Sequence, residues 1–371
     1  MYPEIIRLFL KLGVSAFGGP AAHIAMMEEE FVSKRKWMSR EHFLDLMGAT
    51  NLIPGPNSTE MVMHLGLHRA GLAGMLLAGA SFIFPAALMT LLLAVFYVAY
   101  GDLPQVEPFL MGIKPAVLVL ILAALIKLGK KALKKQAYLI LGIGVAAAGL
   151  WGLNEVFAIL LGGFIGMIAI QAANKLNSIA LFALPILSIT QVSNEKLLTL
   201  FLSFLKIGAI LFGSGYVLVA YLEGELVENL GWLTQQQLLD AIAAGQFTPG
   251  PVLTTATFVG YQVGGYWGAL LATLGIFLPS FCFVYVLNPL IPKLRSSEWS
   301  AAFLDAVNVS ALGIMAAVLI SLTQQSVFTP FDWRALLVLA VGAFMQFGPK
   351  KFGAPYIVLM GAVLGWLLSF I

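Results

Sequence analysis

The chain has 371 residues, of which 60% are hydrophobic and 11% are charged, and its formal net charge is +3. A soluble domain carries about 25% charged residues, so the composition excludes a soluble globular protein. The single cysteine, Cys282, excludes an internal disulfide and most thiolate metal sites. Apolar runs at 72–100, 106–127 and 266–291 exceed the roughly 20 residues that span a bilayer, so we expect a polytopic membrane protein.

The first predicted element, residues 4–32, is interrupted at Phe-Gly-Gly-Pro, residues 17–20. Each arm has about 14 residues and reaches about 21 Å as a helix, which is short of the roughly 30 Å hydrocarbon core. We therefore expect the segment to dip into the membrane and return, which places Lys11 beside Arg7 at the cytoplasmic face. Residues 178–192 must then form a short crossing helix. If the first segment spans fully, they stay on one side instead.

The second element is divided by Pro54-Gly55-Pro56 into segments 41–53 and 56–69, each too short to cross. Proline disfavours helix at the residue before it and suits the first turn of the helix that follows. We expect two half-helices that meet inside the membrane, where irregular backbone survives only if it is buried in protein or lines a wet cavity. The second half-helix would present free N–H groups and a positive dipole end, which attract anions. A tight turn between surface helices is the alternative.

The remainder of the chain repeats the first part. Residues 9–60 align with 204–255 without a gap, and the match continues after one deletion. Shared rare residues in one register are improbable by chance, so we predict two homologous repeats, 1–176 and 196–371. The linker at 177–195 would contain the short crossing helix. The identities include Lys11/Lys206, Glu28/Glu223, Trp37/Trp232, Asp45/Asp240, Gly71/Gly265, Pro85/Pro279 and the Pro-Gly-Pro motif, repeated at 249–251.

The two repeats carry opposite charge bias. Basic clusters occupy 34–40 and 127–135 in the first repeat, whereas the corresponding segments of the second, 223–234 and 324–333, contain no base. Because basic loops face the cytoplasm, the two copies should lie in opposite orientations. We therefore predict an all-α polytopic membrane protein built from two homologous inverted-topology repeats with broken, partly re-entrant helices.

Two convergent helix N-termini and two symmetric lysines predict the anion site of a secondary transporter, at the midplane between the repeats. The lysines could equally snorkel to an interface, and the glycines could serve close helix packing. The predicted substrate-binding residues are Lys11, Gly18, Gly19, Gly55, Asn57, Ser58, Thr59, Lys206, Gly213, Ser214, Gly250, Thr254 and Thr255.

Acidic and histidine side chains in apolar segments are the candidates for coupling. We expect Glu28 and Glu223 to bind protons, because an intramembrane acid is a functional candidate by default. Solvation at a helix end is the alternative for Glu28. Glu60, His64 and His68 lie along one helix face at metal-ligand spacing, but the second repeat has no counterpart ligands, and a proton relay confined to one half fits the pattern no less well. We predict no metal site and no cofactor.

The duplicated pattern of Phe-Gly-Gly or Phe-Gly-Ser-Gly, then Trp, then Pro-Gly-Pro, together with GGPAAHIAMMEEEFV and GQFTPGPV, resembles the chromate ion transporter family in its long two-domain form. Phe-Gly-Ser-Gly departs from Phe-Gly-Gly-Pro at Ser214 and Gly215, so the two cavity walls are not identical. The resemblance covers nearly the whole chain.

The resemblance implies a bacterial inner-membrane carrier that exports chromate and is driven by the proton motive force. Chromate and sulfate are similar tetrahedral dianions, so sulfate is a natural competitor, and another oxyanion remains an alternative substrate. A passive anion channel is the alternative mechanism, since half-helix pairs also build pores. The chain contains none of the catalytic motifs that would indicate a membrane-embedded enzyme. The expected partners are the oxyanion and membrane lipid, with a homodimer left open and no nucleic acid.

Overall fold

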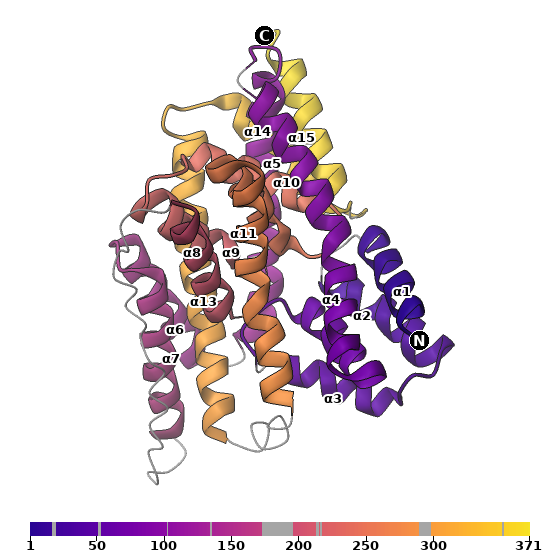
Figure 1. The fold of residues 1–371 in the computed structure, drawn as a ribbon. Helices are drawn as coiled ribbons and strands as arrows, with labels where there is room; N and C mark the ends of the chain where they lie inside the picture. The colour runs from indigo at the N-terminus through magenta and orange to yellow at the C-terminus, as the bar shows by residue number, and fades with distance from the viewer. Residues whose placement is uncertain are drawn as a thin grey trace.

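The computed structural model describes residues 1–16, 20–50, 53–101, 103–133, 136–172, 196–212, 215, 217–288, 298–350 and 352–371. The first part of the chain forms α1 (Tyr2–Ser15), α2 (Pro20–Met27), the π-helical turn η1 (Glu28–Lys34), α3 (Arg40–Thr50), α4 (Asn57–Tyr100), α5 (Glu107–Ala132), α6 (Gln136–Leu150) and α7 (Glu155–Ala172) (Figure 1). The second part forms α8 (Lys196–Ile210), α9 (Leu218–Leu222), the π-helical turn η2 (Glu223–Asn229), α10 (Gln235–Phe247), the 3-10 turn η3 (Val252–Thr254), α11 (Thr255–Leu287), α13 (Glu298–Val327), α14 (Trp333–Phe347) and α15 (Ala354–Leu368).

Four of the described helices are long and apolar enough to cross a membrane. They are Asn57–Tyr100, Glu107–Lys130, Val252–Val286 and Ala301–Val327. The helices α6, α7, α14 and α15 are apolar but shorter. The prediction of an all-α polytopic membrane protein is confirmed, and no strand longer than an isolated bridge occurs among the residues that the structure describes.

Two of these long helices, α4 and α11, are folded back on themselves at the same point of the repeat. In α4, Ala70 has φ −150° and ψ 28°, and Gly71 has φ 62° and ψ −154°. In α11, Gly264 has φ −145° and ψ 22°, and Gly265 has φ 61° and ψ −149°. A positive φ of this kind is readily adopted by glycine alone. The two repeats therefore share not only residues but the same pair of unusual backbone conformations.

We call residues 57–69 the short arm of α4 and residues 72–100 its long arm. The arms pack through glycines, because a Cβ atom on Gly66 would overlap the Gly74 carbonyl group and a Cβ atom on Gly74 would overlap that of Gly66. In α11, Gly260 and Gly268 stand in the same reciprocal relation. Such small residues let two backbones approach closely in lipid, where no hydrophobic effect drives helices together. The sequence-predicted half-helix 56–69 is thus the short arm.

The chain enters and leaves on the same side in the first broken segment. Glu4, near the start of α1, lies 2.9 Å from Arg35, just beyond η1. In the second repeat Lys196, at the start of α8, stacks over the Trp232 ring, beyond η2, at 5.4 Å from its centroid. Both segments therefore dip in and return, as the arm lengths predicted. The crossing predicted at 178–192 lies outside the described residues.

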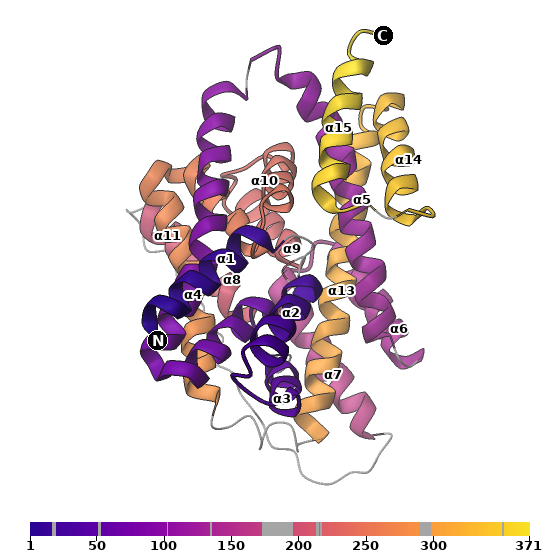
Figure 2. The same ribbon diagram turned by 90° about the vertical axis from the view of Figure 1, so that its right-hand side faces the viewer.

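The two halves are interlocked rather than side by side. In Figures 1 and 2, α5 begins at the end of the molecule opposite to the one where α13 begins, as inverted repeats require. The helix pair α6 and α7 of the first repeat packs against α13 of the second. The pair α14 and α15 of the second repeat packs against α5 of the first. The larger of the two apolar cores consequently contains residues from both repeats.

The topology can be tested with single cysteines in a Cys282→Ser background. Lys130→Cys, near the end of α5, and Gln325→Cys, near the end of α13, should react with an impermeant thiol reagent from opposite sides of the membrane. We expect Lys130→Cys to react from the cytoplasm, because it lies in a basic cluster. Equal reaction of both cysteines from one side would contradict the inverted arrangement.

Candidate functional site

The two Pro-Gly-Pro loops are buried, and each is tied to the opposite repeat. The Gly55 N–H donates to the Leu211 carbonyl oxygen, just after α8, at 2.7 Å. The Gly250 N–H donates to the Ala16 carbonyl oxygen, just after α1, at 3.0 Å. A buried N–H left without a partner costs about 1–3 kcal/mol, so these bonds matter where no water competes. Each loop closes on the broken end of the other repeat's re-entrant segment.

Glycine is required in both loops for two reasons. Gly55 has φ 139° and Gly250 has φ 89°, a region that L side chains rarely adopt. A Cβ atom on Gly55 would also collide with the Glu60 carboxyl group and the Ser280 hydroxyl group, and one on Gly250 would lie 2.9 Å from the Ala86 Cβ atom. The close approach at these glycines is an approach of protein to protein.

The short arm begins with a tight first turn. The N–H groups of Thr59 and Glu60 both bond to the Pro56 carbonyl oxygen, at 2.8 and 3.0 Å. In the second repeat the Thr254 N–H bonds in the same way to the Pro251 carbonyl oxygen at 3.0 Å. These tight first turns, and the bonds that hold the loop glycines, satisfy donors that the sequence alone leaves open.

Side-chain hydroxyl groups surround both loops. His23, on α2, contacts the Ser58 hydroxyl at 3.2 Å and the Ala16 carbonyl oxygen at 3.0 Å. On the other side, the buried Thr90 hydroxyl lies 3.4 Å from that of Thr248 and 3.3 Å from that of Thr254. Ser58 and Thr254 were predicted site residues. His23, Thr90 and Thr248 were not, although a polar residue inside an apolar run was the available signal.

The two symmetric lysines have different surroundings. Lys206 pairs with Glu225, which also accepts from the Ser203 hydroxyl at 3.1 Å. In the first repeat the acid at the position of Glu225 is Glu30, and it binds Arg35 at 2.8 Å instead. Lys11 is exposed and has no ion pair among the described residues. The structure therefore does not place the two lysines in equivalent roles.

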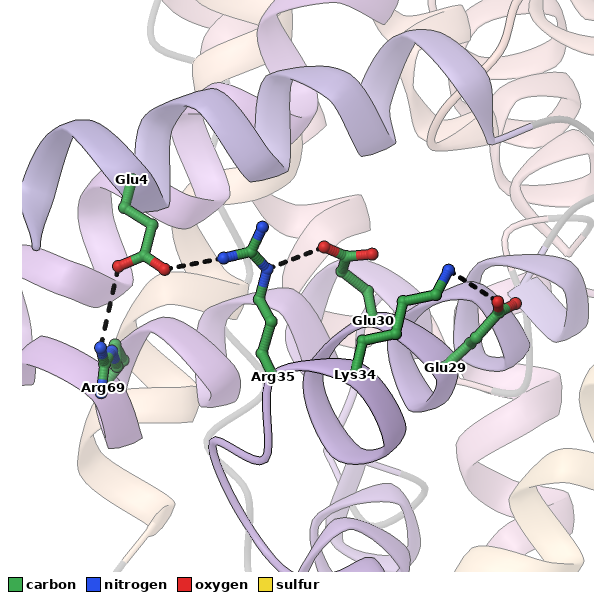
Figure 3. A network of polar contacts seen from close by, with 6 residues as sticks. All are labelled: Glu4, Glu29, Glu30, Lys34, Arg35 and Arg69. Carbon is green, nitrogen blue, oxygen red and sulfur yellow. Dashed lines mark hydrogen bonds and ion pairs between the residues drawn. The ribbon is translucent and has the colours of Figure 1, made fainter.

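Charged side chains form a network at the N-terminal end of α1 (Figure 3). Glu4 lies between Arg35, at 2.9 Å, and Arg69, at 3.7 Å. Lys34 donates a hydrogen bond to Glu29, which lowers the pKa of that carboxyl. A cavity of about 450 Å³ opens beside this network and is lined by Pro3, Glu4, Arg7, Leu8, Lys11, Glu30 and Arg35. Three cations and two carboxylates line the cavity, and Arg35 pairs with both carboxylates, so Arg7 and Lys11 give it an excess of positive charge that attracts anions.

The two predicted coupling acids also differ. Glu28 lies 2.8 Å from Arg40, and its side chain is 30% exposed. Glu223 is buried and accepts a hydrogen bond from Gln235 at 2.9 Å. A further buried acid, Asp240, accepts from the Tyr97 hydroxyl at 2.9 Å and lies 4.0 Å from Lys114. Lys114 is a charge inside an apolar span that sequence reasoning passed over.

Several predicted site residues cannot be placed. Gly18, Gly19, Gly213 and Ser214 lie outside the described residues. Of the others, Gly55, Gly250 and Thr254 contact the opposite repeat, and Ser58 contacts His23 of its own repeat. Thr255 bonds to the Val252 carbonyl oxygen at 2.8 Å within its own turn. Asn57 begins the short arm.

Comparison with known proteins identifies what the chain is similar to. A family model described as chromate transporter matches residues 3–167 and 198–366. A chromate transport protein of Pseudomonas aeruginosa is 29% identical over 99% of this chain and 92% of its own length. A probable chromate transport protein of Synechococcus elongatus is 30% identical over 98% and 94%. An uncharacterized transporter of Bacillus subtilis is 25% identical and covers 42% of this chain and 90% of its own length. No solved structure matches the chain.

The need for glycine in the loops predicts a loss of stability on substitution. Gly55→Ala and Gly250→Ala should each lower the free energy of unfolding by roughly 1–3 kcal/mol, the usual cost of a non-glycine residue in such a conformation. Gly144→Ala is the control, because a Cβ atom there meets nothing within 4 Å. Thermal denaturation of the purified protein in detergent measures the effect. A wild-type melting temperature for Gly55→Ala would contradict the loop geometry.

Proposed function

The chain belongs to the chromate transporter family, and from this membership we propose that it is a secondary transporter of chromate in the bacterial inner membrane. We further propose that it exports the oxyanion and is driven by the proton motive force. The observation that carries the proposal is the reciprocal pair of bonds from Gly55 to Leu211 and from Gly250 to Ala16. Inverted repeats that meet at broken helices are the usual architecture of alternating access.

The reciprocal bonds support a specific way to hold the anion. A dianion stripped of water needs several donors, because an uncompensated buried charge is very costly. When one repeat rocks against the other, the Gly55 N–H leaves the Leu211 carbonyl oxygen and becomes available to an oxyanion. The Ser58 and Thr254 hydroxyl groups are further donors beside the loops. In this mechanism the substrate replaces a carbonyl oxygen of the opposite repeat as acceptor.

Charge supports cytoplasmic capture and hence export. The cavity lined by Arg7, Lys11 and Arg35 adjoins the basic segment 34–40, which the positive-inside rule places in the cytoplasm. At the corresponding place in the second repeat, Lys206 pairs with Glu225. The two entrances are therefore unequal in charge. An oxyanion gathers at the cytoplasmic entrance by electrostatic attraction.

Transport in inverted membrane vesicles tests the function. We expect labelled chromate to accumulate above its external concentration when a proton gradient is imposed, and a protonophore should abolish the accumulation. Excess sulfate should compete, because it presents the same tetrahedral dianion. A passive channel would bring chromate only to equilibrium. If the vesicles transport another oxyanion but not chromate, the protein is a transporter with a different substrate.

The lysines predict separable defects. Lys11→Gln should weaken chromate capture about tenfold at low ionic strength, because a lysine beside the cavity attracts the dianion by long-range electrostatics, and should leave the melting temperature unchanged. Lys206→Gln should lower the melting temperature, because it leaves Glu225 unpaired, and Glu225→Gln in the same chain should restore it. Unchanged chromate binding in Lys11→Gln would return that lysine to the snorkelling interpretation.

A further inference from the structure

The short arm of α4 carries a carboxyl group in an unusual position. Glu60 is completely buried, and neither of its carboxyl oxygens makes a hydrogen bond of ordinary geometry with a described residue. Its Oε1 atom faces the Ser280 hydroxyl of α11 across Gly55, because both atoms crowd the point where a Gly55 Cβ atom would lie. Ser280 is fully buried, and its hydroxyl group likewise makes no hydrogen bond of ordinary geometry with a described residue. The acid thus lies directly behind a loop that we propose opens during transport.

A histidine continues this cluster along the same helix face. His64 is one turn beyond Glu60, is 1% exposed, and has no ordinary hydrogen bond at either ring nitrogen among the described residues. Asn288, just after α11, and His42 of α3 face it. Two further histidines lie on or near the arm: His68, whose ring centroid is 5.1 Å from that of His42, and His23 of α2, which contacts Ser58 and Ala16. No described cation pairs with Glu60.

The surroundings determine the chemical state of Glu60. An isolated carboxylate in such a place would cost far more than a protein of ordinary stability can supply, and a buried group without a cation becomes neutral instead. This conformation therefore holds the carboxylic acid. A metal ion is a poor occupant, because the described residues contain no group of three or more histidine, cysteine, aspartate or glutamate ligands.

The second repeat shows that the fold does not need this cluster. The second repeat has Thr255 at the position of Glu60 and Phe258 at that of His64, and the first-repeat counterpart of Ser280 is Ala86. The Thr255 hydroxyl group donates a hydrogen bond to the Val252 carbonyl oxygen, and Phe258 packs against Tyr97. The same broken helix thus forms without an ionisable side chain. Glu60 and His64 of the first repeat and Ser280 of the second therefore form a polar cluster at only one of the two symmetry-related places, which indicates a task that this place performs alone.

We propose that Glu60, within the buried cluster that it forms with His64 and Ser280, binds the proton whose movement is coupled to oxyanion transport. This inference rests on the proposed function. When the Gly55 loop leaves Leu211, Glu60 meets water and releases its proton, and it takes one up before the loop closes again. His64 lies one turn away as the acceptor that passes the proton along the arm.

The test uses proteoliposomes that contain an internal pH dye and the full-length protein. Chromate is added to drive net transport, and exchange of labelled against unlabelled chromate is measured separately. Glu60→Gln imitates the protonated acid, so it should fold normally. We expect its chromate-driven proton flux to be at least tenfold lower than that of wild type. Its chromate exchange rate should stay within about twofold of the wild-type rate. Glu60→Asp should retain measurable proton flux, and Glu41→Gln, which changes an exposed carboxyl on α3, should behave as wild type.

The outcomes separate this inference from the transport function. If wild-type protein neither exchanges nor accumulates chromate, the proposed function fails. If wild-type protein transports and Glu60→Gln keeps the full proton flux, Glu60 does not carry the proton. Loss of exchange in a correctly folded Glu60→Gln would assign Glu60 to substrate binding and overturn the inference. Flux that follows sodium and ignores pH would overturn it as well.

Discussion

The constraint on which this structure depends is the lack of water inside a bilayer. A break in a helix exposes N–H and C=O groups, and each unsatisfied group is costly. Here the breaks of one repeat supply the partners for those of the other, since the Gly55 and Gly250 N–H groups bind the carbonyl oxygens that end α8 and α1. Neither repeat can satisfy its own break. The pseudo-symmetry of the chain is therefore a condition of stability as well as a duplication of sequence.

Much of the architecture could be predicted because it depends on the properties of residues that are close together in the sequence. Proline and glycine mark the breaks, and the arm lengths of the first segment imply a return to the same face, which the contact between Glu4 and Arg35 supports. The internal homology predicted a repeated fold, and the matching dihedral angles at Gly71 and Gly265 follow that homology. Charge bias in the loops pointed to inversion. Each of these signals is readable from a few neighbouring residues.

The contacts between distant elements could not be predicted in the same way. Uniformly apolar helices have no polar face to show which neighbour they meet, so the packing of α6 and α7 on α13 leaves no trace in the hydrophobic pattern. Partner choice among charges is equally hidden. Lys11 and Lys206 occupy corresponding positions in the two repeats. In the first repeat the acid Glu30 pairs with Arg35, whereas in the second repeat the corresponding acid, Glu225, pairs with Lys206. The site is therefore less predictable than the fold that carries it.

The packing of each repeat against helices of the other affects how the protein assembles during synthesis. When α7 has been synthesised, neither it nor α6 has its final neighbour, because α13 begins more than a hundred residues later. In the newly inserted first half, α6 and α7 lack their contacts with α13. In the same way, α5 lacks its contacts with α14 and α15. Long separations of this kind delay assembly until the chain is complete. The newly inserted first half is thus an open intermediate, and the last two helices close the molecule.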